Sequence, residues 1–327
     1  MGNKKKRRNL LVIGFLFITP LLLGCVNQSK SKQTIMLILD TQDSHYNQMI
    51  EEGVMAAISD YNDVSILKRR LKNTKESYQQ NVYVQEAIDL GVDTIIFSAI
   101  NIEKSKKDLE FIQKKEIRVI MMDSFFENPY NFNYIGTNNK EAGELVGKTL
   151  VELIGSEAEV GVLSFEDESL SSQEKEKEKA FYRFIEEFSR IKIIEKKLTR
   201  SDNETVQLLT EEMLTNNPEM DGIIAFNEYT TIGAGRAVKN KKMQNKVAVI
   251  GFDSQIECVE LLENGSILAL IVQNPFAIGY LSIQSALNPS NDEKINKPIF
   301  TEVELVTQKT MYQSKKERLL FPFSYQD

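Results

Sequence analysis

Residues 247–253 read VAVIGFD, and residues 268–273 read LALIVQ. Each stretch is a short apolar run that ends on a polar side chain, Asp253 in the first and Gln273 in the second. Unbroken apolar runs of this length are typical of strands that are buried on both faces of a parallel sheet. A segment with the apolar spacing of a helix, around Cys258, separates the two runs. This part of the chain is therefore predicted to form a strand–helix–strand unit.

The same alternation of apolar runs and helical segments continues upstream with little interruption. Strands are predicted at Thr34–Leu39, Thr94–Ser98, Arg118–Met122, Val160–Phe165 and Gly222–Phe226. Residues with helical spacing lie between them, for example Ala142, Leu145, Val146, Leu150 and Leu153, and then Phe181, Phe184, Ile185 and Phe188. Repeated units of this kind predict an α/β fold with doubly wound parallel sheets that helices cover on both faces.

The N-terminus has the features of a bacterial lipoprotein signal. Residues 4–8 are all Lys or Arg, and an apolar run follows from Leu10 to Leu23. That run is too short to span a bilayer comfortably, which favours a signal-peptide core. It ends in Leu-Leu-Gly-Cys at residues 22–25, which resembles a lipobox. We therefore expect a signal peptide over residues 1–24, a lipidated Cys25 and a polar tether over residues 25–33.

Length and charge limit the classes of partner. Removing 24 residues from the 327 leaves 303, enough for two domains of roughly 150 residues each. The removed segment carries five positive charges and no acids, so the formal net charge falls from −7 to −12. An acidic surface argues against nucleic acid as a partner and leaves membrane attachment to the lipid. With Cys25 lipidated, Cys258 is the remaining cysteine, and we expect it to be a buried structural thiol.

Polar residues follow the predicted strands at their carboxyl ends: Asp40, Ser98, Asp123, Asn227, Asp253 and Gln273. In open parallel sheets, ligands bind at this edge. Each residue taken alone is explained as a cap of the next helix, which contributes about 1 kcal/mol. Gln is a poor capping residue, however, and several carboxylates at one edge are costly without a polyhydroxylated or cationic partner. The set as a whole favours a ligand site.

Several longer motifs carry a specific likeness. In the C-terminal half they are residues 220–227 (MDGIIAFN), 249–253 (VIGFD) and 272–279 (VQNPFAIG). In the N-terminal half they are residues 117–123 (IRVIMMD) and 135–143 (IGTNNKEAG). Together they resemble the ribose/galactose-type sugar-binding proteins of the type 1 periplasmic-binding-protein family.

The resemblance implies a fold of two lobes joined by a three-strand hinge. Its first lobe comprises residues 34–136 plus 274–301, and its second lobe comprises residues 137–273 plus 302–327. The family's ligand-binding positions fall on Tyr46, Asp123, Lys175, Asn227, Asp253 and Gln273. Four positions depart from the family. Ser124 and Lys175 each stand in place of an arginine, and of the aromatic residues that enclose the sugar, Tyr46 is retained while its neighbour is Asn47 and the opposing one is missing near Ser201.

The function implied by the resemblance is that of an extracytoplasmic lipoprotein on the cell membrane. It captures a sugar or similar small polar ligand, such as a carbohydrate, for an ABC importer, as a monomer that is not an enzyme and uses no cofactor or metal. The alternative is a sensor that reports its ligand to a membrane receptor such as a histidine kinase. The departures in the site and the charged, aromatic tail Thr310–Asp327 leave this alternative open.

Three patterns match parts of enzyme motifs but lack essential members. Residues 142–149 (AGELVGKT) miss the first glycine of a phosphate-binding loop and have the spacing of a helix interior. Residues 172–175 (SQEK) and 201–203 (SDN) match two elements of acyl-enzyme hydrolases without the third, KTG. The single histidine, His45, excludes a His-pair zinc site. It is expected in the exposed first loop, with a ligand contact beside Tyr46 as the alternative. The run Glu174–Lys179 is interpreted as a solvated helix face.

Overall fold

The structure of the protein is a computed structural model, which describes residues within the unit Lys32–Asp327. The residues described are 32–40, 44–59, 61–71, 78–115, 117–123, 132–165, 172–199, 202–288 and 298–322. The predicted signal peptide, Cys25 and most of the tether lie outside these residues, as do Ser124 and Ser201. The first strand begins at Gln33. The polar sequence before it predicts that Gln33 belongs to the tether, so the strand starts one residue earlier than expected.

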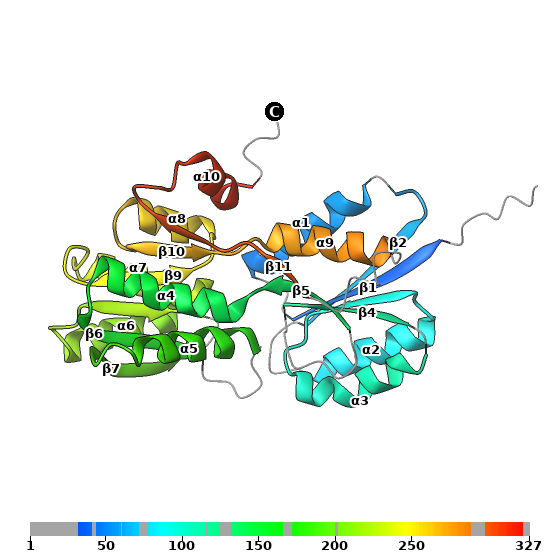
Figure 1. Ribbon diagram of the computed structural model, residues 1–327, viewed down its shortest axis with the longest axis horizontal. Helices are drawn as coiled ribbons and strands as arrows, with labels where there is room; N and C mark the ends of the chain where they lie inside the picture. The colour runs from blue at the N-terminus through cyan, green and yellow to red at the C-terminus, as the bar shows by residue number, and fades with distance from the viewer. Residues whose placement is uncertain are drawn as a thin grey trace, which may run out of the picture. The chain divides into compact units, whose positions relative to one another are not determined.

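The first sheet is fully parallel, with the strand order β11-β5-β4-β3-β1-β2 (Figure 1). Its strands are β1 (Gln33–Leu39), β2 (Val64–Arg70), β3 (Thr94–Phe97), β4 (Arg118–Met122), β5 (Asn133–Thr137) and β11 (Ile299–Thr301). Helices α1 (His45–Ile58) and α9 (Pro275–Leu287) cover one face, and α2 (Tyr78–Leu90) and α3 (Ile102–Gln113) cover the other. This sheet and its helices form the first lobe.

The second sheet has the order β12-β10-β9-β8-β6-β7, in which β12 alone is antiparallel. Its strands are β6 (Glu157–Phe165), β7 (Arg190–Thr199), β8 (Gly222–Ala225), β9 (Ala248–Phe252), β10 (Ala269–Val272) and β12 (Glu304–Thr307). Helices α4 (Asn139–Leu153) and α5 (Ser172–Ile185) cover one face. The other face is covered by α6 (Asn203–Asn216), α7 (Glu228–Asn240), α8 (Ile256–Glu263) and α10 (Ser314–Leu320). This sheet and its helices form the second lobe.

The chain passes between the lobes three times within the described residues, from β5 to α4, from β10 to α9 and from β11 to β12. The central strands are fully buried because helices cover both faces of each sheet, as their unbroken apolar sequences predict. The predicted fold class, two doubly wound lobes joined by three crossings, is confirmed. In the described part of the chain, no helix has the length and apolar character needed to cross a membrane.

Two long strands were missed in the sequence because both lie at sheet edges. β2 reads VSILKRR and is half-buried throughout, and β7 reads RIKIIEKKLT with exposed charged residues along it. An edge strand is exposed to solvent on one side, so its sequence carries charges and lacks the unbroken apolar run of a central strand. The predicted helix around Phe181 ends at Ile185, and Phe188 lies beyond it.

Helices α1 and α9 contact each other through their backbones. A Cβ atom on Gly279 would lie 2.0 Å from the carbonyl oxygen of Ile50, and one on Gly53 would lie 2.0 Å from that of Phe276. No L-side chain fits at either distance, so the two glycines set the separation of the helices. The interface is therefore sensitive to the addition of a single methyl group.

Gly279→Ala should lower the free energy of unfolding by about 2–4 kcal/mol, because the backbone of α1 has to move away. Ser285→Ala is the matched control on the same helix. The Ser285 hydroxyl is buried and has no hydrogen-bond partner among the described residues, so its removal should leave stability unchanged or raise it. Urea unfolding of the Lys32–Asp327 unit measures both. Equal stability of Gly279→Ala and wild type would contradict the close contact.

Candidate functional site

In each lobe, an aspartate follows the end of a central strand, and the two aspartates have the same backbone conformation. Asp123 follows β4 with φ of 59°, and Asp253 follows β9 with φ of 74°. The N–H of Asp123 donates to the carbonyl of Ile135 at 3.0 Å, and that of Asp253 donates to the carbonyl of Ile271 at 3.1 Å. Positive φ is uncommon outside glycine, and Asp and Asn tolerate it best. The repeated turn therefore puts a carboxylate at the carboxyl edge of each sheet.

Asp123 is held by residues of the first lobe. It is 1% exposed, and the Tyr46 hydroxyl donates to its Oδ2 at 2.7 Å while the Thr137 N–H donates to its Oδ1 at 3.4 Å. The Tyr134 hydroxyl lies 3.2 Å from the Asp123 carbonyl oxygen, to which it donates. Tyr46 reaches Asp123 from the first turn of α1, which Ser44 caps by accepting from the Asn47 N–H at 3.0 Å.

Asp253 is held by residues of the second lobe. The Gln273 amide Nε2 donates to Asp253 Oδ1 at 2.6 Å, and the backbone N–H of Glu228 also donates to the Asp253 carboxylate. Gln273 directly follows β10, the neighbour of β9, and is 3% exposed. Adjacent parallel strands end at the same edge, so the predicted proximity of Asp253 and Gln273 is what the structure shows.

Asn227 is the third predicted site residue in the second lobe, beside Asp253 and Gln273, and it is the N-cap of α7. Its Oδ1 accepts from the Thr230 N–H at 3.0 Å, and the Thr230 hydroxyl completes a capping box. The capping role, which the sequence left open as an alternative, is therefore present. Because the cap uses the side-chain oxygen, the amide nitrogen is the group that Asn227 can offer to a ligand.

Lys177 brings the positive charge to these aspartates. It is 2% exposed, and its Nζ lies 4.6 Å from the centroid of the Phe252 ring. Its charge lowers the pKa of both Asp123 and Asp253, in opposition to the larger effect of burial, which raises both. Helix α4 packs directly against this turn of α5, because a Cβ atom on Gly143 of α4 would lie 2.1 Å from the carbonyl oxygen of Lys177.

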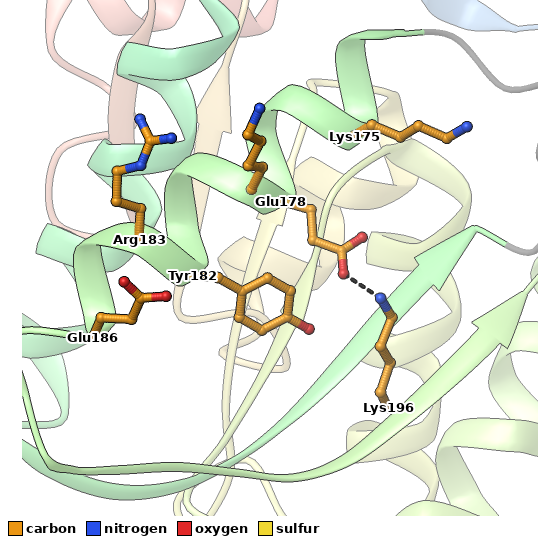
Figure 2. A pocket seen from close by; sticks show the side chains of 7 residues that line it. Lys175, Glu178, Tyr182, Arg183, Glu186 and Lys196 are labelled. Atoms are coloured by element: carbon orange, nitrogen blue, oxygen red, sulfur yellow. Dashed lines mark hydrogen bonds and ion pairs between the residues drawn. The ribbon is translucent and has the colours of Figure 1, made fainter.

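The structure does not place Lys175 among the other predicted site residues. Lys175 is exposed and lines an open surface pocket of ≈ 400 Å³ between α5 and β7 (Figure 2). The remaining residues around this pocket are Glu178, Lys179, Tyr182, Arg183, Glu186 and Lys196. Positions two apart on a helix point about 200° away from each other, so Lys175 and Lys177 serve opposite sides of α5.

Sequence reasoning missed Lys177 because it lies in the alternating run Glu174–Lys179, which was interpreted as a solvated face. The available signal was its spacing. Lys177 precedes the buried Phe181 by four residues, which puts it on the apolar stripe of the helix. A buried lysine requires negative charge nearby, and the charge of Lys177 acts on two of the predicted residues, Asp123 and Asp253.

Glu228 was also missed, and it links the two lobes. This first residue of α7 is 6% exposed, and its Oε1 accepts from the backbone N–H of His45 at 3.3 Å. The N–H of Tyr46 donates to the same carboxylate. A carboxylate at a helix N-terminus is favoured by the unpaired N–H groups and the helix dipole of α1. His45, expected in an exposed loop, is instead the half-buried first residue of α1.

Burial has the largest effect on the pKa values of Asp123, Glu228 and His45. It raises the pKa of Asp123 to about 7, although the Tyr46 hydrogen bond and Lys177 oppose it. It raises the pKa of Glu228 to about 8, with a further contribution from the charge of Asp253. Burial also lowers the pKa of His45. Across the residues that the structure describes, no three His, Cys, Asp or Glu side chains are arranged to hold a metal ion.

The fold and the site together define a two-lobed α/β protein with polar and charged side chains at the facing ends of its sheets. The sequence model of the periplasmic binding protein domain matches residues 35–294. The chain belongs to this family, and the resemblance seen in its motifs is confirmed.

Similar proteins align with most of the chain. The ribose import binding protein of Bacillus subtilis (strain 168) is 22% identical over 286 residues, which span 86% of this chain and 89% of that protein. An ABC transporter solute-binding protein from Agrobacterium vitis, solved with bound D-fucose, aligns with a TM-score of 0.81 at 25% identity, over 88% of this chain and 99% of that one. The XylFII–LytSN complex aligns with a TM-score of 0.74 at 24% identity, over 85% and 98% respectively, and shows the fold.

The raised pKa values of Asp123 and Glu228 predict that the ligand-free protein loses stability as pH rises. Their pKa values in the folded protein, about 7 and about 8, exceed the ordinary 3.8 and 4.5. The folded state therefore binds more protons than the unfolded chain between these limits. The contribution is complete below about pH 4 and is lost as pH rises through about 7 to 8.

We expect the melting temperature of the ligand-free Lys32–Asp327 unit to fall by roughly 5 °C between about pH 5 and pH 8.5, measured by calorimetry. Glu228→Gln should reduce this fall because a neutral amide does not titrate. Glu219→Gln is the control, since that side chain is 83% exposed, and it should leave the fall unchanged. A constant or rising melting temperature in the wild type would show that the two carboxyl groups are not desolvated.

Proposed function

We propose that this chain captures a monosaccharide or a similar polyhydroxylated ligand between its two lobes, and does so outside the cytoplasm. The observation that carries the proposal is the placement of one buried aspartate at the carboxyl edge of each lobe's sheet, Asp123 and Asp253, with the charge of Lys177 acting on both. Carboxylates accept hydrogen bonds from hydroxyl groups, and a lysine or an amide nitrogen donates to them. Side chains of both kinds, supplied by two lobes, orient a small polar ligand without changing it.

The relatives support a binding role rather than catalysis. The Bacillus subtilis relative is named a ribose import binding protein, and the Agrobacterium vitis protein was solved with D-fucose. Further structures of the same fold hold D-arabinose and D-allose. A sugar hydroxyl both donates and accepts, which suits a site that combines Asp253, Gln273 and Lys177. Tyr46 adds an aromatic ring on which the apolar face of a sugar stacks.

The ligand is released to a membrane partner in this proposal. The relatives named as ABC transporter or import binding proteins favour a permease. A receptor is the second candidate, because XylFII, which shares the fold, is seen in a complex with another protein, LytSN. The protein itself acts as a monomer, since the first and second lobes of one chain supply every residue of the proposed site.

Attachment to the outer face of the cell membrane through Cys25 completes the proposal. It rests on the basic residues 4–8, the apolar run to Leu23 and the Leu-Leu-Gly-Cys sequence at residues 22–25. A binding protein that is tethered in this way stays close to its permease, which raises the effective concentration of each for the other.

Asp253→Asn should reduce affinity for the captured sugar by about 100-fold or more, because it removes a charged acceptor while keeping the shape and the tolerance of positive φ. The melting temperature of the ligand-free protein should stay equal or rise, since a buried charge is removed. A panel of pentoses and hexoses, screened by thermal shift and followed by calorimetric titration, measures both effects.

Asp202→Asn is the matched control for this measurement. Asp202 is an exposed N-cap on α6, and asparagine preserves the cap. It should change neither affinity nor melting temperature. Wild-type affinity in Asp253→Asn would remove Asp253 from the site, and an equal loss of ligand-free stability would make it a structural residue.

Cys25→Ser should abolish lipid labelling and release the mature domain from the membrane fraction, because the thioether-forming thiol is lost. Metabolic labelling with an alkyne-tagged palmitate and cell fractionation measure the effect. Cys258→Ser is the control, since Cys258 is buried in the second lobe, and it should remain labelled. Labelling of Cys25→Ser would refute the lipid anchor at this residue.

A further inference from the structure

The N-terminal cap of helix α1 is shared between the two lobes. The helix begins at His45, so the N–H groups of its first turn have no acceptor within the helix. The N–H of Asn47 donates to the side chain of Ser44, in the same lobe, at 3.0 Å. The N–H groups of His45 and Tyr46 donate instead to the carboxyl group of Glu228 in the second lobe, that of His45 at 3.3 Å. The first lobe therefore satisfies only part of this helix terminus, and the second lobe satisfies the rest.

Glu228 also connects the two aspartates of the site. Its backbone N–H donates to the carboxylate of Asp253, while its side chain accepts from the N–H of Tyr46. The Tyr46 hydroxyl in turn donates to Asp123 Oδ2 at 2.7 Å. The Glu228 side chain is 6% exposed, so little water competes for its hydrogen bonds. A continuous series of contacts thus runs from Asp253 through Glu228 and Tyr46 to Asp123.

Helix α1 cannot follow Glu228 when the lobes separate. Gly53 and Gly279 place the backbones of α1 and α9 in direct contact, which holds α1 in the first lobe without an intervening side chain. Separation of the lobes therefore breaks the hydrogen bonds that Glu228 accepts from His45 and Tyr46. The two N–H groups then bond to water, and each such exchange loses the net contribution of a protein hydrogen bond.

We propose that Glu228 is a positioning residue for ligand capture, which completes the cap of α1 from the opposite lobe and thereby favours closure of the lobes and fixes Tyr46 beside Asp123 before a ligand arrives. The cap requires an acceptor oxygen and no charge. Burial raises the pKa of Glu228 to about 8, so its carboxyl group is largely protonated at neutral pH. A protonated carboxyl group still accepts hydrogen bonds, as the oxygen of an amide does. The role of Tyr46 rests on the proposed function, whereas closure of the ligand-free chain does not.

Amide hydrogen exchange of the ligand-free Lys32–Asp327 unit, resolved by residue with NMR, tests the shared cap. In the wild type, the amides of His45 and Tyr46 should exchange roughly 5- to 30-fold more slowly than unprotected amides, as expected for two ordinary hydrogen bonds. Glu228→Ala should remove this protection at both positions. The amide of Asn47 is the internal control, because its acceptor lies in its own lobe and its exchange should not change.

Glu228→Gln should retain the protection, since the amide oxygen accepts in place of the carboxyl oxygen. Glu219→Gln, which alters an 83% exposed side chain, should also retain it. Unprotected amides at both positions in the wild type would overturn the inference, as would protection that survives Glu228→Ala. Loss of protection throughout the first lobe in Glu228→Ala would assign Glu228 to global stability and would overturn it too.

Pulsed electron paramagnetic resonance measures closure directly. Spin labels on Val82→Cys of α2 and Leu208→Cys of α6 lie in different lobes, at side chains that are 56% and 66% exposed. The buried Cys258 stays unlabelled. Without ligand, Glu228→Ala should increase the population at long distances, while Glu228→Gln should match the protein with native Glu228. Identical distance distributions in all three would overturn the inference. These outcomes leave the proposed function standing, because sugar binding by the wild type is measured separately.

Discussion

Burial of negative charge is the constraint on which the rest of the site depends. Asp123 and Asp253 sit at the ends of strands in two different lobes, and each is almost fully removed from solvent. Hydrogen bonds from Tyr46 and Gln273 and the charge of Lys177 offset part of the desolvation cost. The remaining cost appears as pKa values displaced toward neutrality. The carboxylates are therefore only partly compensated in the ligand-free protein. A ligand that donates hydrogen bonds to them would recover part of their desolvation cost, and that recovery would contribute to the binding free energy.

The central parts of the fold are readable from the sequence because each buried strand is an unbroken apolar run. VAVIGFD and LALIVQ predict β9 and β10 within a residue or two, and the polar residues that end them predict Asp253 and Gln273 as neighbours. Edge strands such as β7 escape the same reasoning, since solvent on one side permits charges along the strand. Asn227 shows where this reasoning stops: its oxygen caps α7, and no pattern in the sequence separates a helix cap from a proposed ligand contact.

The residues that sequence reasoning missed are those whose meaning comes from a second element. In the sequence, Lys177 is one of several alternating charges, which is typical of a solvated helix face. In the structure, α4 and the Phe252 ring pack against it. Glu228 looks like the acidic first turn of its own helix, yet its carboxylate accepts from the first turn of α1 in the other lobe. Lys175 was placed by family resemblance alone, and it lies on the side of α5 opposite to Lys177. Contacts between distant segments cannot be deduced from local spacing.

The backbone contact between α1 and α9 connects Tyr46 on α1 to the crossing between β10 and α9. Helix α9 begins at Pro275, immediately after the capping residue Asn274 and the site residue Gln273. Gly53 and Gly279 leave no side chain between α9 and α1, so there is no compliant layer to absorb movement. Any rotation of the chain at residues 273–274 is therefore transmitted rigidly to α1 and, through it, to Tyr46. The two helices are therefore expected to move as one rigid body about the crossing that follows Gln273.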